Sequence, residues 1–536
     1  MGSMSSNAIK ETARTKAITT IVSQQSLQPA PPLEGFFRTT LSITDAVTAP
    51  VAGPECIWFY DDLIGHDDGL VAKLEASLQA TLVFAPYLAG RLEEIPFKPG
   101  GDWTERGGRL QAVYGSESSP PGVQLTVLAC DTCLGDIIPD AASRGRLWQS
   151  GRVPFSLFRA DSTPLALDDG HTVDNLPVTK VTITTFPCGG LAVAAKVVHP
   201  LYDAESLVRF MHTWSATHAN MFHGAEHGIL ELRLQPDLFM SYALGDINAP
   251  CPDPSITQVS RELPLHRYDW WASADGCPPS LRWRTEPPAD TRIPWEDADL
   301  EAPISSYTIL FSRPEIEAMY LEAALQGTCA GLSSWGTISR LDALLAHIWS
   351  LIVRARKLPT TDTVYANMAL GFRSRISPSL PEEFVGCPAT LAYAQGTASD
   401  AEGSLATFAT AFRRTISSFT PTTIPAFLHD LAHQVECRRY WGTSPSRHHI
   451  TATSWLHNRL YDVDWGIPGC RPRLVEPVMP AFLICVTEGV PTERTTTDSE
   501  GQLPWYTNGA TVSIHFESEV VERIINDPVL RRFDSS

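Results

Sequence analysis

Residues 188–214 read C-G-G-L-A-V-A-A-K-V-V-H-P-L-Y-D-A-E-S-L-V-R-F-M-H-T-W. The apolar run at 188–198 predicts a buried strand. A helix should begin near residue 204, because apolar side chains follow at i, i+3, i+4 and i+7: Leu207, Phe210, Met211 and Trp214. His199 and Asp203 stand at the corner between the two elements, and Pro200 keeps the residue before it extended. The segment therefore predicts a rigidly mounted imidazole, as a general base requires.

Strands and helices alternate on both sides of this corner. Strands are expected at 56–60, 307–311 and 511–516, and helices at 70–84, 339–356 and from 518 onward. Ser339 and Asp342 form a capping-box pattern at the start of the central helix. The pattern predicts two mixed α/β domains, at 1–235 and 304–536. Residues 236–303, rich in Pro, Asp and Trp, are expected to form a crossover linker.

The composition excludes several classes of function. The chain has 536 residues, with 41 Lys+Arg against 60 Asp+Glu, and a formal charge of −19. Such an acidic chain argues against a nucleic-acid or anionic-membrane binder. No apolar run is long enough to span a membrane, and the first residues lack the apolar core of a signal peptide. We therefore expect a cytoplasmic protein.

Metal binding is not indicated by the cysteines or histidines. The eleven cysteines include a single C-x2-C pair, Cys130 and Cys133, without the second pair of a zinc site. His429 and His433 are one helical turn apart, but Asp430 stands where a zinc protease needs Glu. We expect free thiols, an exposed helix face at these histidines and no metal.

His199 and Asp203 have a plain alternative interpretation. A His-x-x-x-Asp pattern is common by chance, and Asp203 is well placed to be only the N-cap of the next helix. Even in a catalytic site, Asp203 is more suited to organising the loop than to relaying charge. No Ser or Cys nucleophile stands beside His199, which favours direct transfer over a covalent intermediate.

The chain resembles the BAHD acyl-CoA-dependent acyltransferases of plants and fungi in five elements that follow the family order. His199 to Asp203 resembles the family's H-x-x-x-D-G signature, and the other elements are 84–92 (F-A-P-Y-L-A-G-R-L), 338–358, 371–386 (G-F-R-S-R-I-S-P-S-L-P-E-E-F-V-G) and T-S-W at 453–455 with 461–468. Two departures stand out. Ala204 replaces the glycine of the signature, and the D-F-G-W-G element is shortened to Asp464-Trp465-Gly466. The long crossover and loops resemble fungal more than plant members.

The resemblance implies an α/β fold of two chloramphenicol-acetyltransferase-like domains with mixed sheets and a central solvent channel between them. It also implies a role for each matching residue. His199 would be the general base, Thr453 would stabilise the oxyanion, and Trp455 would line the acceptor side. Asp203 would belong with His199 and Thr453 to the catalytic residues and would be oriented inward to Arg340, a structural residue. Arg373 and Arg375 would contact the phosphates of coenzyme A. Asp464, Trp465 and Gly466 would form a structural loop.

We therefore expect a monomeric acyltransferase of specialised metabolism. It would move an acyl group from acyl-CoA, its co-substrate, to a hydroxyl of a small molecule, in preference to an amine, without an acyl-enzyme. Two alternatives stay open: the same fold and His199 used for a cyclisation or ester cleavage without coenzyme A, and a non-catalytic binding protein.

Overall fold

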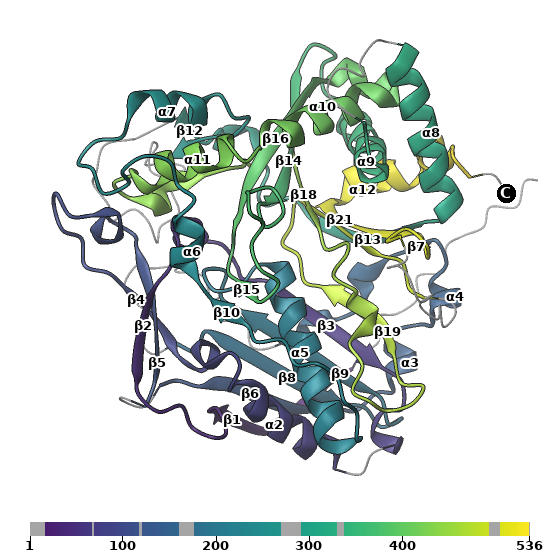
Figure 1. Ribbon diagram of the computed structural model, residues 1–536. Helices are drawn as coiled ribbons and strands as arrows, with labels where there is room; N and C mark the ends of the chain where they lie inside the picture. The colour runs from purple at the N-terminus through teal and green to yellow at the C-terminus, as the bar shows by residue number, and fades with distance from the viewer. Residues whose placement is uncertain are drawn as a thin grey trace, which may run out of the picture.

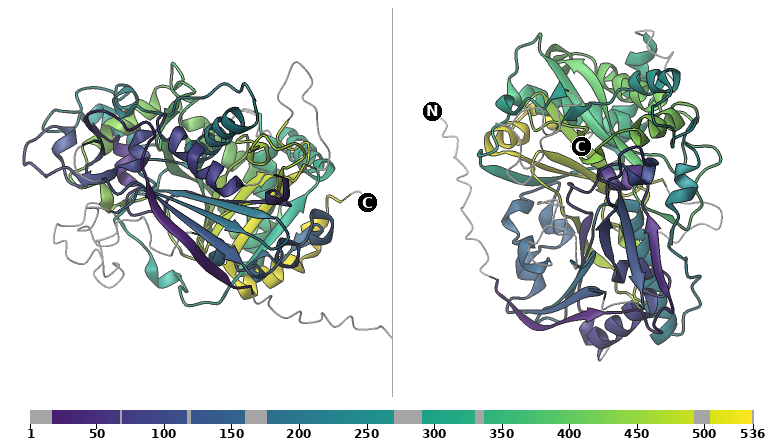
Figure 2. Two further views of the ribbon diagram at one scale, coloured as in Figure 1. Left: turned by 90° about the horizontal axis from the view of Figure 1, so that it is seen from below. Right: turned by 90° about the vertical axis from the view of Figure 1, so that its left-hand side faces the viewer.

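The structure is a computed structural model that describes residues 17–66, 69–116, 120–159, 176–269, 291–329, 337–491 and 504–534. It contains two large mixed β-sheets, each with helices packed against it (Figure 1). In the right-hand view of Figure 2 the half drawn in purple and blue lies below the half drawn in green. This is the predicted fold class, two mixed α/β domains.

The N-terminal sheet has six strands in the order β1-β6-β8-β9-β3-β19. Only β6 and β8 are parallel neighbours, and every other pair is antiparallel. Its strands are Thr19–Leu27, Val123–Cys130, Thr179–Thr185, Leu191–Val197, Glu55–Tyr60 and Pro472–Pro477. Residues 1–30 carry no clear apolar pattern and suggest a frayed end, but Thr19–Leu27 pairs with β6 as an edge strand.

Two helices cover one face of this sheet. They are α2 (Leu70–Thr81) and α5 (Ala204–Phe222), which also pack on each other. Their buried side chains join those of Trp58 and Val193 in one apolar cluster. The short helices α3 (Leu134–Ile137) and α4 (Ala141–Arg144) follow β6 along the chain, and Leu134 and Ile137 belong to the apolar cluster of the other face.

The C-terminal sheet has seven strands in the order β16-β14-β18-β20-β21-β13-β7. They are Ala389–Thr397, Thr363–Gly371, His449–Ser454, Leu483–Glu488, Ala510–Glu517, Ile304–Phe311 and Leu147–Trp148. The central strands β14, β18 and β20 are parallel. Four helices pack against this half: α8 (Arg313–Cys329), α9 (Arg340–Arg356), α10 (Leu405–Ser418) and α12 (Ser518–Ile525). The capping box predicted for α9 is confirmed, since Ser339 and Asp342 make both of its hydrogen bonds.

Each large sheet is completed by a strand from the other half of the sequence. Strand β19 follows the C-terminal strand β18 along the chain, yet it pairs with β3 at the edge of the N-terminal sheet. Conversely, β7 comes from the N-terminal half and pairs with β13. The two halves are therefore interlocked by main-chain hydrogen bonds. The predicted boundaries at 235 and 303 stay a prediction.

Smaller elements lie around the two sheets. They are two three-stranded sheets, β2 (Phe36–Thr40), β5 (Leu110–Gly115) and β4 (Arg91–Glu94), and β12 (Thr291–Arg292), β11 (Tyr268–Asp269) and β17 (Tyr440–Trp441); the pair β10 (Arg233–Leu234) and β15 (Phe384–Val385); and helices α1 (Ile43–Val47), α6 (Pro236–Met240), α7 (Pro254–Arg261) and α11 (Thr423–Ala432). The predicted crossover thus carries α6, α7, β11 and β12 within its described part.

The His429 prediction needs a correction. An exposed helix face was expected, but His429 is 1% exposed and is hydrogen-bonded through both ring nitrogens, to Leu244 O and Asp253 N. Among the described residues, no three metal-ligating side chains converge on one point. None of the helices described there has the length and apolarity to cross a bilayer.

Candidate active site

His199 lies in the turn between β9, which ends at Val197, and α5, which begins at Ala204. All seven residues of β9 are buried, so the turn starts from a rigid strand. Gly53 packs against it so closely that a Cβ atom there would lie 1.8 Å from the carbonyl oxygen of Val197 and 3.0 Å from the nitrogen of His199. Only glycine leaves the backbone at this corner where it is.

The imidazole of His199 is kept neutral by its surroundings. Burial lowers its pKa below 6.5, and the His199 backbone and the Asp203 carboxylate offset this only in part. Nδ1 is buried and has no hydrogen-bond partner on another described residue. A neutral imidazole is the form that accepts a proton, so His199 is ready to act as a base at neutral pH.

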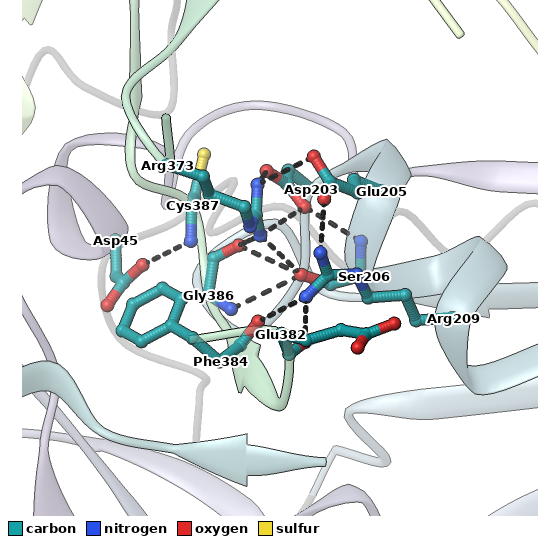
Figure 3. Close-up of polar contacts among 10 residues, drawn as sticks. All are labelled: Asp45, Asp203, Glu205, Ser206, Arg209, Arg373, Glu382, Phe384, Gly386 and Cys387. Carbon is teal, nitrogen blue, oxygen red and sulfur yellow. Dashed lines mark hydrogen bonds and ion pairs between the residues drawn. The ribbon is translucent and has the colours of Figure 1, made fainter. Parts of the chain in front are cut away.

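Asp203 caps α5 and is turned toward an arginine. Its Oδ1 accepts from the Ser206 backbone nitrogen at 2.9 Å, the usual N-cap bond. The Arg373 guanidinium binds both carboxylate oxygens, with Nη2 3.0 Å from Oδ1 (Figure 3). Burial alone would raise the pKa of Asp203, but Arg373 and Ser206 together lower it. Asp203 is therefore ionised, and it holds the loop that carries His199.

The predicted pairing of Asp203 with Arg340 is wrong. Arg340 is bidentate with Glu317, with Nε 2.7 Å from Oε1, and its guanidinium lies over the rings of Tyr320 and Tyr506. Arg373 takes its place because β14 ends at Gly371, so that Arg373 emerges from the end of a strand directly beside Asp203.

Arg373 was expected to contact the phosphates of coenzyme A. Its side chain is 11% exposed, and the donors on Nη1 and Nη2 point to Asp203, Ser206 and Gly386. This geometry gives the phosphate role no support. Arg375 differs: it is half-buried, and no described residue forms a hydrogen bond with its guanidinium. A contact between Arg375 and phosphate stays a prediction.

The turn at Gly386 and Cys387 joins the two halves at this point. The Gly386 carbonyl accepts from the Asp203 backbone nitrogen at 3.3 Å, from Ser206 Oγ at 3.2 Å and from Arg373 Nη2 at 3.2 Å (Figure 3). The hydroxyl of Ser206 in turn accepts from the Gly386 nitrogen at 3.3 Å. The His199 loop is thus fastened to the C-terminal half through both backbone and side chains.

Thr453 lies on the face of the C-terminal sheet that is turned away from the helices. Along β18, Ile450 and Ala452 are buried in the core beneath α9 and α10, so Thr453 projects to the opposite face. Cys485 pairs with Thr453 on the neighbouring strand β20 and so projects to the same face. Its side chain packs in the apolar cluster of the N-terminal half. The Thr453 hydroxyl is therefore on the side of the sheet that faces the His199 domain.

Thr453 also lies at the sheet edge where Arg373 meets Asp203. Strands β14 and β18 are parallel, with Met368 opposite Ala452, so both have their carboxyl ends at this edge. Trp455, just beyond, donates its backbone nitrogen to Val486 O at 2.9 Å, and its side chain is 2% exposed within the same apolar cluster as Cys485. The roles of Thr453 and Trp455 toward substrate stay predictions, as does the channel.

The shortened loop at Asp464-Trp465-Gly466 packs against α5. The Trp465 ring is fully buried against Trp214 at 5.0 Å, and its carbonyl lies 2.9 Å from His218 Nδ1. Asp464 Oδ1 accepts from the Gly466 nitrogen at 2.9 Å. These contacts fix the loop to the helix that Asp203 caps.

Four contributors to this geometry were not anticipated: Gly53, Asp45, Ser206 and Gly386. Ser42 and Asp45 do have the spacing of a capping box, which the structure contains. That pattern would have predicted the helix at 43–47. It gives no indication that Asp45 Oδ1 accepts a hydrogen bond from the Cys387 backbone nitrogen, at 2.6 Å, in the turn beside Arg373.

Comparisons with known proteins agree with this architecture. The profile of the Transferase family matches residues 163–225 and 315–483. The acyltransferase AFT15-1 of Alternaria alternata is 24% identical, and the alignment covers 87% of this chain and 88% of that protein.

Two solved structures share the fold at 16% identity. The first is TRI101 of F. sporotrichioides complexed with coenzyme A and T-2, with a TM-score of 0.64 over 92% of this chain and 98% of that one. The second is vinorine synthase, with a TM-score of 0.55 over 94% and 96%. These matches agree with the resemblance of the chain to the BAHD acyl-CoA-dependent acyltransferases.

Proposed function

We propose that this protein transfers an acyl group from acyl-CoA to a hydroxyl group of a small specialised metabolite, with His199 as the general base. The observation that carries the proposal is the buried His199 imidazole, whose pKa burial lowers, at a corner held by the Asp203–Arg373 ion pair in a chain that matches the Transferase family profile. An amine acceptor is the second choice. We further propose that the protein acts as a cytosolic monomer.

The reaction begins with the acceptor hydroxyl beside His199. The imidazole takes the hydroxyl proton while the oxygen attacks the thioester carbonyl carbon. The tetrahedral intermediate then collapses with cleavage of the carbon–sulfur bond. The coenzyme A sulfur leaves as a thiolate and receives the proton from the imidazolium, which restores the neutral base.

The negative charge on the carbonyl oxygen needs a donor aimed at it. The Thr453 hydroxyl is our candidate, because it faces the His199 domain at the sheet edge where the two halves meet. Asp203 is a positioning residue in this mechanism, since Arg373 and the cap of α5 occupy its carboxylate.

Direct transfer is supported by the state of the thiol beside the Asp203–Arg373 pair. Cys387 is 3% exposed, and burial raises its pKa well above the ordinary value. A buried thiol that stays protonated is a poor nucleophile. Cys387 therefore gives no support to an acyl-enzyme.

The test is calorimetric titration with acetyl-CoA and longer acyl-CoAs, on the wild type, His199→Ala and the control His227→Ala. The ring of His227 is exposed, beyond the end of α5. All three proteins should bind acyl-CoA. With a panel of alcohols and amines, only the wild type and the control should release coenzyme A, which a thiol reagent detects.

The outcomes separate the proposal from its alternatives. If neither the wild type nor the variants bind acyl-CoA, alone or with the alcohols present, a reaction without coenzyme A or a binding role replaces the proposal. Full turnover in His199→Ala would remove His199 as the base. Release of coenzyme A only in the presence of an amine would make the acceptor an amine instead of a hydroxyl.

A further inference from the structure

Asp45 is a buried carboxylate far from His199 in sequence. It lies in α1 and is 2% exposed. Its Oδ2 accepts from Ser42 N at 3.0 Å and from Ser42 Oγ at 2.6 Å, which completes the cap of α1. Its Oδ1 has a separate partner, the backbone nitrogen of Cys387, at 2.6 Å. One carboxylate therefore serves two elements that are distant in the chain.

The partner of Asp45 belongs to the same peptide group as the Gly386 carbonyl. The N–H of that group points to Asp45, and its C=O accepts from Arg373 Nη2, Ser206 Oγ and the Asp203 nitrogen (Figure 3). An anion at the N–H and a guanidinium at the C=O polarise the peptide in the same direction. Such hydrogen bonds in series strengthen one another.

We infer that Asp45 is a positioning residue for His199, acting through the Gly386–Cys387 peptide on the Asp203–Arg373 pair. This inference rests on the proposed role of His199 as the base. Asp45 fixes the orientation of the peptide, the peptide carbonyl holds Arg373 and Ser206, and these hold Asp203 four residues beyond His199.

The backbone at Gly386 is suited to this arrangement. Its φ of +139° is one that side-chain-bearing residues rarely adopt, and a Cβ atom there would lie 3.2 Å from Asp45 Oδ1. Gly386 therefore allows the peptide to approach the carboxylate.

The pKa of the Asp45 carboxyl is set by its burial and its hydrogen bonds. Burial raises the pKa and outweighs the bonds from Ser42 and Cys387, which lower it; with a small upward contribution from Asp203 the pKa is about 6. At neutral pH the group is ionised and accepts from all three donors.

The experiment measures the titration of His199 by NMR in protein labelled at the histidine rings, with the signal assigned by its loss in His199→Ala. Asp45→Ala frees the peptide, so Asp203 should withdraw from His199. Because the Asp203 carboxylate raises the pKa of His199, the titration midpoint should then fall below that of the wild type. The readout needs no acceptor, so it is independent of whether turnover is found.

Two variants separate the turn from the helix cap. Ser42→Ala weakens the α1 cap but leaves the bond from Cys387, and Asp45→Asn keeps an amide oxygen for that bond. Both variants should have a lower melting temperature than the wild type. Their titration midpoint for His199 should equal that of the wild type. If Asp45→Ala does not fold, Gly386→Ala displaces the same peptide and should lower the midpoint.

The inference is overturned if Asp45→Ala melts earlier but titrates like the wild type. It is equally overturned if Ser42→Ala or Asp45→Asn shifts the midpoint as far as Asp45→Ala, because the effect would then not pass through the Cys387 bond.

Discussion

Replacement of Asp203 by alanine should destabilise the protein by an amount that follows from its contacts. The side chains of Asp203 and Arg373 are 15% and 11% exposed, so the change leaves a buried guanidinium with only the more exposed Glu205 carboxylate, 3.4 Å from Nη1, as counter-ion. Breaking a buried pair in this way costs about 3–5 kcal/mol, and loss of the α5 cap adds about 1 kcal/mol. We expect a loss of about 4–6 kcal/mol, a large part of the roughly 5–15 kcal/mol that keeps a domain folded.

The structure offers a matched control in the pair Arg340–Glu317. It has similar bidentate geometry, but its side chains are 31% and 28% exposed. Solvent screens such a pair, and Glu317→Ala should cost no more than about 1 kcal/mol. Urea unfolding of both variants, followed by fluorescence, gives the two values in one assay.

A double-mutant cycle identifies the partner of Asp203. Asp203→Asn keeps an acceptor for the cap, so its coupling to Arg373→Met reports the ion pair, while its coupling to Arg340→Met should be near zero. A cost for Asp203→Ala as small as that of Glu317→Ala, or a strong coupling to Arg340, would refute the reasoning.

The pair should be stabilising over most of the pH range. Because Arg373 lowers the pKa of Asp203 in the folded state, its contribution is fully present above the unfolded value near 4. It is lost as the pH falls through the lower folded value. The stability difference between wild type and Asp203→Asn should therefore be constant from pH 5 to 8 and shrink below about pH 4.

Three further changes test the site. His199→Ala should lower turnover by about 10²–10⁴ with acyl-CoA affinity retained. Because the pKa of His199 lies below 6.5, the acid limb of the wild-type pH–rate profile should also lie below pH 6.5. An acid limb above that value would contradict the neutral buried imidazole. Thr453→Val should lower kcat by about 10²–10³ without changing acyl-CoA binding, and unchanged kcat would remove it from the oxyanion role. Gly53→Ala should lower both kcat and the melting temperature, at a cost of about 1–3 kcal/mol for overpacking, whereas Gly135→Ala, whose Cβ meets nothing within 4 Å, should do neither.

Local features of the fold were predictable from the sequence. The capping box at Ser339, the apolar repeat of α5 and the buried strand before His199 each depend on neighbours within a few residues. Such short-range patterns report which face of an element is buried. They are enough to define the corner at which His199 lies.

The sequence did not predict which residues would pair with the site residues. Arg340 and Arg373 are both arginines near the start or end of a regular element, and nothing local distinguishes them as partners of Asp203. The choice depends on the end of β14, which brings Arg373 to a carboxylate 170 positions away in the sequence. Asp45 reaches Cys387 across an even larger separation, 342 positions. Contacts of this kind follow from the topology of the sheets.

The interlocked strands have a consequence for how the chain folds during synthesis. Strand β3 leaves the ribosome early, but its neighbour β19 follows about 400 residues later, which at 5–20 residues per second is a delay of roughly 20–80 seconds. Throughout that time the nascent N-terminal sheet has an open, apolar edge, the kind of surface on which chains aggregate. A chaperone that shields this edge should therefore raise the yield of folded protein, and ending translation before residue 472 should leave a chain that aggregates instead of an independent N-terminal domain.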